Sequence, residues 1–145
     1  MQGLTSLLDR IHAEEQARQT EATRFVIEHK MKIALAPRKW NELKRQWQET
    51  CVKLNASGGN FRYDERSPDE VAVVRLNSEG VVIGRVVLTF YLDIPVIICD
   101  ISLHRQDRIG FRPIADDIVW TLNGANQPHT VIVEYPFGVL SGLKF

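Results

Sequence analysis

The sequence has few of the residues that build disulfide frameworks and metal sites. It contains two cysteines, Cys51 and Cys99, and four histidines, and none of them falls into a CxxC or H-x-x-x-H spacing. Both cysteines stand among apolar residues, where a free thiol behaves as a small hydrophobic side chain. We therefore expect two reduced core cysteines in a cytoplasmic protein that has no metal and no cofactor.

The sequence also lacks a hydrophobic run long enough to cross a membrane, and it shows no signal peptide. Its 18 basic and 18 acidic residues give no net charge that would attract nucleic acid or anionic lipid. Residues 1–60 carry ten basic and seven acidic residues, and residues 61–145 carry eight and eleven. Because opposite charges attract, the two halves can stabilise each other when they pack. We expect neither a membrane nor a nucleic-acid partner.

Motifs for catalysis are absent as well: there is no phosphate-binding glycine loop, EF-hand or nucleophile elbow. The most polar segment follows position 103, and its candidate ligand-binding residues are His104, Arg105, Arg108 and Arg112. A histidine beside guanidinium donors suits the binding of an anionic group. The alternative interpretation is a loop, residues 104–116, that is charged only because it is solvated.

Apolar residues in the N-terminal part recur at helical spacing. The pattern begins at Leu4, continues through Ile11, becomes polar over residues 12–24 and resumes from Phe25 to about Leu35. Pro37 is expected to end this helix. A second helix then carries the apolar stripe Trp40, Leu43, Trp47, Cys51 and Leu54. Residues 1–24 are expected either as an exposed helix that docks on a protein partner or as a frayed arm.

From Phe61 onward, alternating and β-branched residues indicate strands. Short turn sequences at residues 77–80 and 93–95 join the central strands, which predicts an antiparallel meander. Further strands are expected at residues 118–122 and 130–135, followed by a tail that folds over an edge. The predicted fold is a single α+β domain over residues 1–145, with two N-terminal helices packed on one face of a twisted antiparallel meander sheet of five to six strands.

The second face of this sheet is unusually apolar for a surface that faces water. Its expected residues are Val81, Ile83, Val87, Tyr91, Val96 and Ile98. Three explanations remain open: a helix or the tail of the same chain covers this face, a second copy covers it in a homodimer, or it lines a pocket for an apolar ligand.

The absence of a catalytic signature favours a non-enzymatic binding or assembly module that forms a homodimer through the second sheet face. The alternative is a domain that binds or hydrolyses a small anionic or apolar ligand at a site between the sheet and the helices. The sequence identifies neither the ligand nor the partner.

Overall fold

The structure is a computed structural model that describes residues 2–102, 105–115 and 117–145, with side chains from residue 5 onward. In these residues it contains two helices and one antiparallel sheet of seven strands, so the fold is α+β. The elements are α1 (Gln2–Ala56), β1 (Phe61–Ser67), β2 (Glu70–Leu76), β3 (Val82–Tyr91), β4 (Val96–Ser102), β5 (Arg105–Ile114), β6 (Asp117–Leu122), β7 (Ala125–Gln127) and α2 (His129–Leu140).

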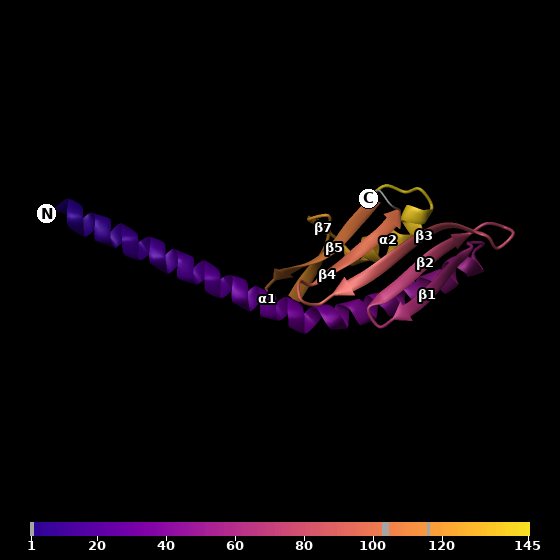
Figure 1. The fold of residues 1–145 in the computed structure, drawn as a ribbon, viewed down its shortest axis with the longest axis horizontal. Helices are drawn as coiled ribbons and strands as arrows, with labels where there is room; N and C mark the ends of the chain where they lie inside the picture. Colours follow the sequence, from indigo (N-terminus) through magenta and orange to yellow (C-terminus); the bar gives the residue numbers. More distant parts are fainter. Residues whose placement is uncertain (1, 103–104, 116) are drawn as a thin grey trace. The chain divides into compact units, whose positions relative to one another are not determined.

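The sheet is a meander in which every strand pairs with its neighbours in the chain (Figure 1). Short turns permit this order, and the turn between β6 and β7 is the clearest case. Asn123 and Gly124 both have positive φ, 50° and 89°, which is the backbone conformation of a two-residue hairpin turn that favours Asn-Gly. Leu122 and Ala125 consequently face each other as the first pair of this hairpin.

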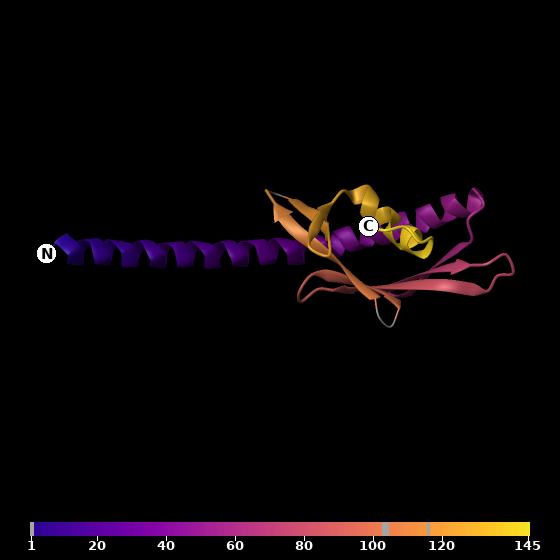
Figure 2. The same ribbon diagram turned by 90° about the horizontal axis from the view of Figure 1, so that it is seen from above.

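The chain divides into two compact units, Met1–Met31 and Lys32–Phe145. The first unit is the N-terminal part of α1. The second unit holds the remainder of α1, the sheet and α2, and its two helical segments lie on one face of the twisted sheet (Figure 2). Helices therefore lie on a single sheet face of the second unit, as expected, but one of them is the C-terminal α2 and not a second N-terminal helix.

The core of the second unit lies between this sheet face and the helices. Val86, Leu88 and Phe90 alternate along β3 and are buried, as the period of a strand requires. The Trp40 ring of α1 stacks on Phe90, with 5.5 Å between the ring centroids, and Trp47 is fully buried. The apolar stripe of the expected second helix therefore forms the helical side of the core.

The prediction of two N-terminal helices is wrong, because α1 continues through Pro37 as one helix of 55 residues. A proline inside a helix leaves the carbonyl four residues earlier without its N–H partner. Here that carbonyl belongs to Ile33, an exposed residue, so water can satisfy it. Ala36 and Trp40 on either side are buried, and their packing stabilises the helix across the proline.

The sheet has seven strands and not five to six, and two segments differ from expectation. The charged segment expected as a loop forms β5, where Asp107, Ile109 and Phe111 alternate inward and are buried. The segment expected as a strand at residues 130–135 lies in α2. Its β-branched residues suggest a strand, but Ile132, Tyr135 and Val139 follow helical spacing and are buried together.

A proline also lies inside α2, and the core compensates for it. Pro136 has no N–H, so the carbonyl of Ile132 lacks its helical donor. The indole N–H of Trp47 donates to that carbonyl oxygen over 3.1 Å. Because both groups are buried, this hydrogen bond removes the penalty of an unpaired carbonyl and joins α1 to α2.

Candidate functional site

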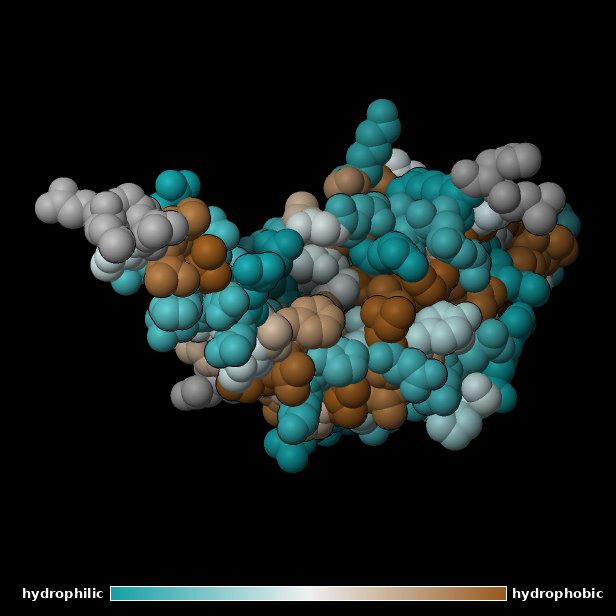
Figure 3. All heavy atoms as spheres, turned by 60° about the vertical axis from the view of Figure 1, so that its left-hand side comes forward, coloured by the Kyte–Doolittle hydropathy of each residue, from teal (hydrophilic) through white to brown (hydrophobic). Residues whose placement is uncertain are grey.

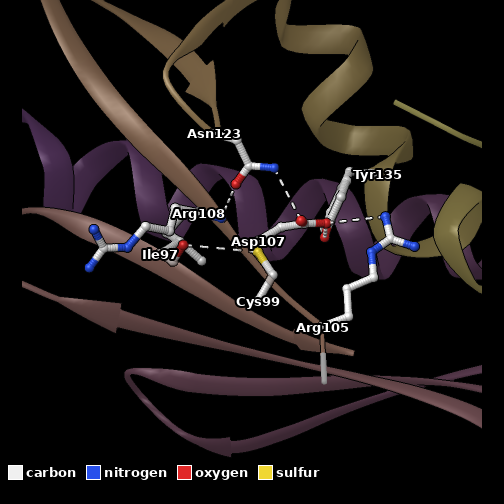
Figure 4. Close-up of polar contacts among 7 residues, drawn as sticks. All are labelled: Ile97, Cys99, Arg105, Asp107, Arg108, Asn123 and Tyr135. Carbon is white, nitrogen blue, oxygen red and sulfur yellow. Dashed lines mark hydrogen bonds and ion pairs between the residues drawn. The ribbon is translucent and has the colours of Figure 1, made fainter. Parts of the chain in front are cut away.

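A buried polar cluster surrounds the carboxylate of Asp107 on β5 (Figure 4). Tyr135 donates its phenol hydrogen to Asp107 Oδ2 over 2.5 Å, and Arg105 Nη2 donates to the same oxygen over 3.3 Å. Asn123 Nδ2 donates to Asp107 Oδ1 over 3.1 Å. The carboxylate, which is only 8% exposed, thus has donors on both of its oxygens.

Local backbone structure places each of these donors. The hairpin turn at Asn123 lets its side-chain oxygen accept the backbone N–H of Arg108, at 2.9 Å, while its amide group faces Asp107. Tyr135 reaches the cluster from the buried side of α2. Cys99 lies directly opposite Asp107 across β4 and β5. The cluster therefore ties β4, β5, the β6–β7 turn and α2 together.

The electrostatics of the cluster favour a stable ion and oppose a reactive one. Burial alone raises the pKa of Asp107, but the hydrogen bonds from Tyr135 and Asn123 and the charge of Arg105 outweigh it, so its pKa lies below the ordinary 3.8. Burial raises the pKa of Tyr135 and of Cys99 above their ordinary values. An ionised, saturated carboxylate is a poor base and a protonated thiol is a poor nucleophile. We conclude that the cluster is structural.

A histidine at the start of α2 is fixed in a similar way. The indole N–H of Trp120 donates to His129 Nδ1 over 2.8 Å, so Nδ1 carries no proton. His129 Nε2 then donates to Gln46 Oε1 at 2.5 Å. Since both ring nitrogens are occupied, His129 connects α1, β6 and α2 and is not free to transfer a proton.

The structure separates the residues of the predicted anion site. Arg105 lies on the helix side of the sheet and pairs with Asp107, whereas Arg108 extends in another direction (Figure 4). Arg112 donates to Asn126 Oδ1 over 2.6 Å and to the carbonyl of Gly124 over 3.0 Å. His104 lies outside the described residues. Anion binding by these residues stays a prediction, and β5 does not bring the three arginines together.

The predicted interface residues lie on or beside the sheet face opposite the helices, which we call the open face. Cross-strand pairs place Val87 beside Asp100, Thr89 beside Ile98, and Tyr91 beside Val96. Val87, Val96 and Ile98 are half-buried, while Ile83 and Tyr91 are 55% and 52% exposed. Val81, which immediately precedes β3, is also exposed.

Charged residues accompany these apolar residues on the open face. Arg85 precedes Val87 by two positions on β3, and Asp100 faces Val87 from β4. A shallow hollow of about 400 Å³ lies here, lined by Arg85, Val87, Asp100, Ile101 and Ser102. Asp100 accepts a hydrogen bond from the amide of Gln106 over 2.8 Å. The open face therefore combines apolar side chains with charges of both signs.

Comparisons with family models, curated proteins and solved structures found no match for this chain. In the described residues, no three histidine, cysteine, aspartate or glutamate side chains are grouped to hold a metal ion. Neither described helix is long and apolar enough to cross a membrane.

The Asp107 cluster does not follow from the sequence patterns, because they predict a strand at Tyr135 and a loop at Asp107. The alternation of Asp107 with Ile109 and Phe111 was the available signal, since it predicts an inward-facing carboxylate. The Asn-Gly pair at Asn123 was a second signal, because it marks a tight hairpin at that position.

Proposed function

We propose that this protein is a non-enzymatic assembly module that forms a homodimer through the open face of β3 and β4. The observation that carries the proposal is the position of Ile83, Val87, Tyr91, Val96 and Ile98 on or beside one sheet face, opposite the helices. Apolar side chains grouped on a water-exposed sheet face are typical of association surfaces. Hydrophobic side chains also interrupt the hydrophilic surface in the space-filling view (Figure 3).

A second copy of this chain is the partner that the charges favour. In a twofold interface the same surface meets itself, so it has to carry complementary groups. Arg85 and Asp100 flank Val87 on the open face, and a twofold axis near Val87 brings each of them to the opposite charge on the second copy. No described residue forms an ion pair with Arg85 in the single chain, which leaves its guanidinium available.

The apolar residues have the character of an interface centre with a polar rim. Val87 and Ile98 are half-buried within the sheet, and the charged residues surround them. Burying such a centre in a second copy removes apolar area from water at about 25 cal/mol per Å². The polar rim at Arg85 and Asp100 then fixes the register of the two copies.

Substitution of Ile98 by Lys tests the proposal. We expect Ile98→Lys to lower the particle mass, measured by light scattering or sedimentation at micromolar concentration, because a buried charge opposes the contact. Val52→Lys is the matched control, since Val52 is an exposed apolar residue of α1 and not part of the open face. Circular dichroism verifies that both variants keep their helices.

A wild-type particle of 16.6 kDa, the mass of one chain, contradicts the proposal. An equal particle mass for Ile98→Lys and Val52→Lys contradicts it as well. Arg85→Glu gives a second measurement that leaves the apolar residues intact. It should weaken association, and combination with Asp100→Arg should restore it.

A further inference from the structure

Among its described residues, the first unit exposes five large hydrophobic side chains along one stripe of α1, and Ile27 is exposed on the opposite side of the helix. Leu7, Leu8, Ile11, Phe25 and Val26 are all exposed, and Phe25 is 70% exposed. At 100° per residue, these five positions lie within one third of the helix circumference. Such a stripe on a long helix normally packs against another surface, because helices in water gain most of their stability from burying an apolar face.

Two charged residues interrupt this stripe at its centre. Glu15 and Arg18 occupy the same face, between the apolar group at Leu7–Ile11 and the apolar group at Phe25–Val26. Neither forms an ion pair with a described residue. Arg18 Nε only donates to the backbone carbonyl of Glu14, at 3.5 Å. An acid and a base without partners on an apolar stripe require compensating charges from elsewhere if the stripe is to be buried.

We propose that this stripe pairs with the same stripe of a second copy in antiparallel orientation, with the twofold axis between Gln16 and Ala17. In this register Glu15 faces Arg18 of the second copy, and Arg18 faces its Glu15. On either side, Ile11 faces Ala22 of the second copy and Leu8 faces its Phe25. All these residues belong to the first unit, so the pairing uses residues 1–31 only.

The charge order selects the antiparallel orientation. In a parallel pair, each Glu15 meets the other Glu15 and each Arg18 meets the other Arg18, and like charges at a helical seam are destabilising. The antiparallel pair converts both contacts into attractions. It also places a large residue, Ile11, against a small one, Ala22, and large and small side chains alternate in well-packed interfaces. The stripe is thus complementary to its own reversed copy.

This inference is independent of the proposed dimer through the open face, because it uses a different surface of the chain. If both contacts form, each chain has two association surfaces. Ile98→Lys disrupts one of them and a charge reversal in α1 weakens the other, so the combination should give the lowest particle mass. Either contact can therefore be disproved while the other one stands.

Charge reversals in the full-length chain test the pairing. Glu15→Arg alone, or Arg18→Glu alone, should raise the dissociation constant of this contact about tenfold, because two attractive pairs become repulsive. The double variant Glu15→Arg/Arg18→Glu should associate as the wild type does, since its charges are only exchanged. An equimolar mixture of the two single variants should also recover association. All are measured by sedimentation in the Ile98→Lys background.

Two controls carry the same changes of charge away from the stripe. Asp9→Arg and Arg10→Glu alter exposed residues on other sides of the helix and should leave the dissociation constant within about twofold of its original value. Equal effects of these controls and of the stripe variants would overturn the proposal. A double variant Glu15→Arg/Arg18→Glu that associates as weakly as the single variants would overturn the proposal too. It would favour a different protein as the partner.

Disulfide cross-linking reports the orientation. Chains carrying Leu8→Cys mixed with chains carrying Phe25→Cys should form the mixed disulfide dimer under mild oxidation, and Leu8→Cys alone should not. The native Cys51 and Cys99 are buried and do not compete. Rapid cross-linking of Leu8→Cys with itself indicates a parallel pair and rejects the inference. Failure to cross-link in the mixture, together with a particle of one chain for Ile98→Lys, rejects it as well.

Discussion

The indole N–H of Trp47 occupies the position that a backbone donor would take on the carbonyl oxygen of Ile132, and Pro136 is the reason that this position is vacant. A side chain of α1 therefore completes the hydrogen bonding of α2. The relationship makes the effects of substitutions at Trp47 and Pro136 dependent on each other.

We expect Trp47→Phe to lower the free energy of unfolding by about 2 kcal/mol, because it leaves the buried Ile132 carbonyl unpaired and loses packing. In the Pro136→Ala background, the new N–H of residue 136 can donate to the Ile132 carbonyl oxygen. Trp47→Phe should therefore cost about 1 kcal/mol less in that background than in the wild type. Urea unfolding of the wild type, the two single variants and the double variant measures this difference.

Trp40→Phe is the control for this cycle. Its indole donates to the carbonyl of Pro68 over 2.8 Å, a bond that residue 136 does not affect. The effects of Trp40→Phe and Pro136→Ala should therefore add. If the effects of Trp47→Phe and Pro136→Ala on the free energy of unfolding also add, the indole of Trp47 does not compensate for the missing N–H of Pro136.

The carboxylate of Asp107 should make the protein sensitive to acid. Its pKa is lower in the folded chain than the ordinary 3.8, because donors from Tyr135, Asn123 and Arg105 outweigh the effect of burial. The folded state therefore holds the ionised form more strongly than the unfolded state does. This stabilisation is complete above the unfolded pKa and is lost as the pH falls below about 4 towards the folded pKa.

Asp107→Asn should lower the free energy of unfolding at pH 7 by about 2 kcal/mol, because an amide oxygen accepts hydrogen bonds less strongly than an ionised carboxylate. The free energy of unfolding of this variant should also decrease less than that of the wild type as the pH falls below about 4. Chemical unfolding measured from pH 3 to pH 7 gives both quantities. Asp93→Asn removes an exposed carboxylate in the β3–β4 turn and should change stability by less than about 0.5 kcal/mol. A pH profile for Asp107→Asn parallel to that of the wild type contradicts the assignment.

A close contact across β5 and β6 gives a third prediction. A Cβ added at Gly110 would collide with Oγ1 of Thr121, whereas the Cβ of Thr121 itself would remain at 3.8 Å. Gly110→Ala should therefore destabilise the protein by about 2 kcal/mol. In Gly110→Ala/Thr121→Ala the colliding oxygen is gone, and most of this loss should be recovered.

Thermal unfolding of the two single variants and the double variant measures the recovery. Thr121→Ala alone measures how much stability is lost with the hydroxyl group. If the double variant is as unstable as the sum of the single variants, the collision with Oγ1 is not the reason that glycine occupies position 110.

Periodic patterns made much of this fold predictable. Two patterns reflect directly which side of an element is buried. The helical stripe from Trp40 to Leu54 and the alternation of Val86, Leu88 and Phe90 each predicted the face that packs in the core. The turns at residues 77–80 and 93–95 predicted the central meander because turn residues act locally. The buried state of Cys51 and Cys99 was predictable for the same reason, since their neighbours are apolar.

The remaining elements depend on contacts between residues distant in sequence. Pro37 normally ends a helix, and only the packing of residues on both sides of it carries α1 through. The β-branched run of α2 is helical because Tyr135 reaches Asp107 and Ile132 receives the indole of Trp47. The network of Asp107 requires the pairing of β4 with β5, which local patterns do not contain.

The outermost strands of the sheet have a consequence for how this protein can assemble. One border, β1, carries Arg62, Asp64, Glu65 and Arg66, and the other, β7, is three residues long. Charged or very short border strands discourage another chain from extending the ladder. Fibrillar growth by strand addition is thereby disfavoured, and neighbouring molecules are directed towards side-chain contacts of finite size.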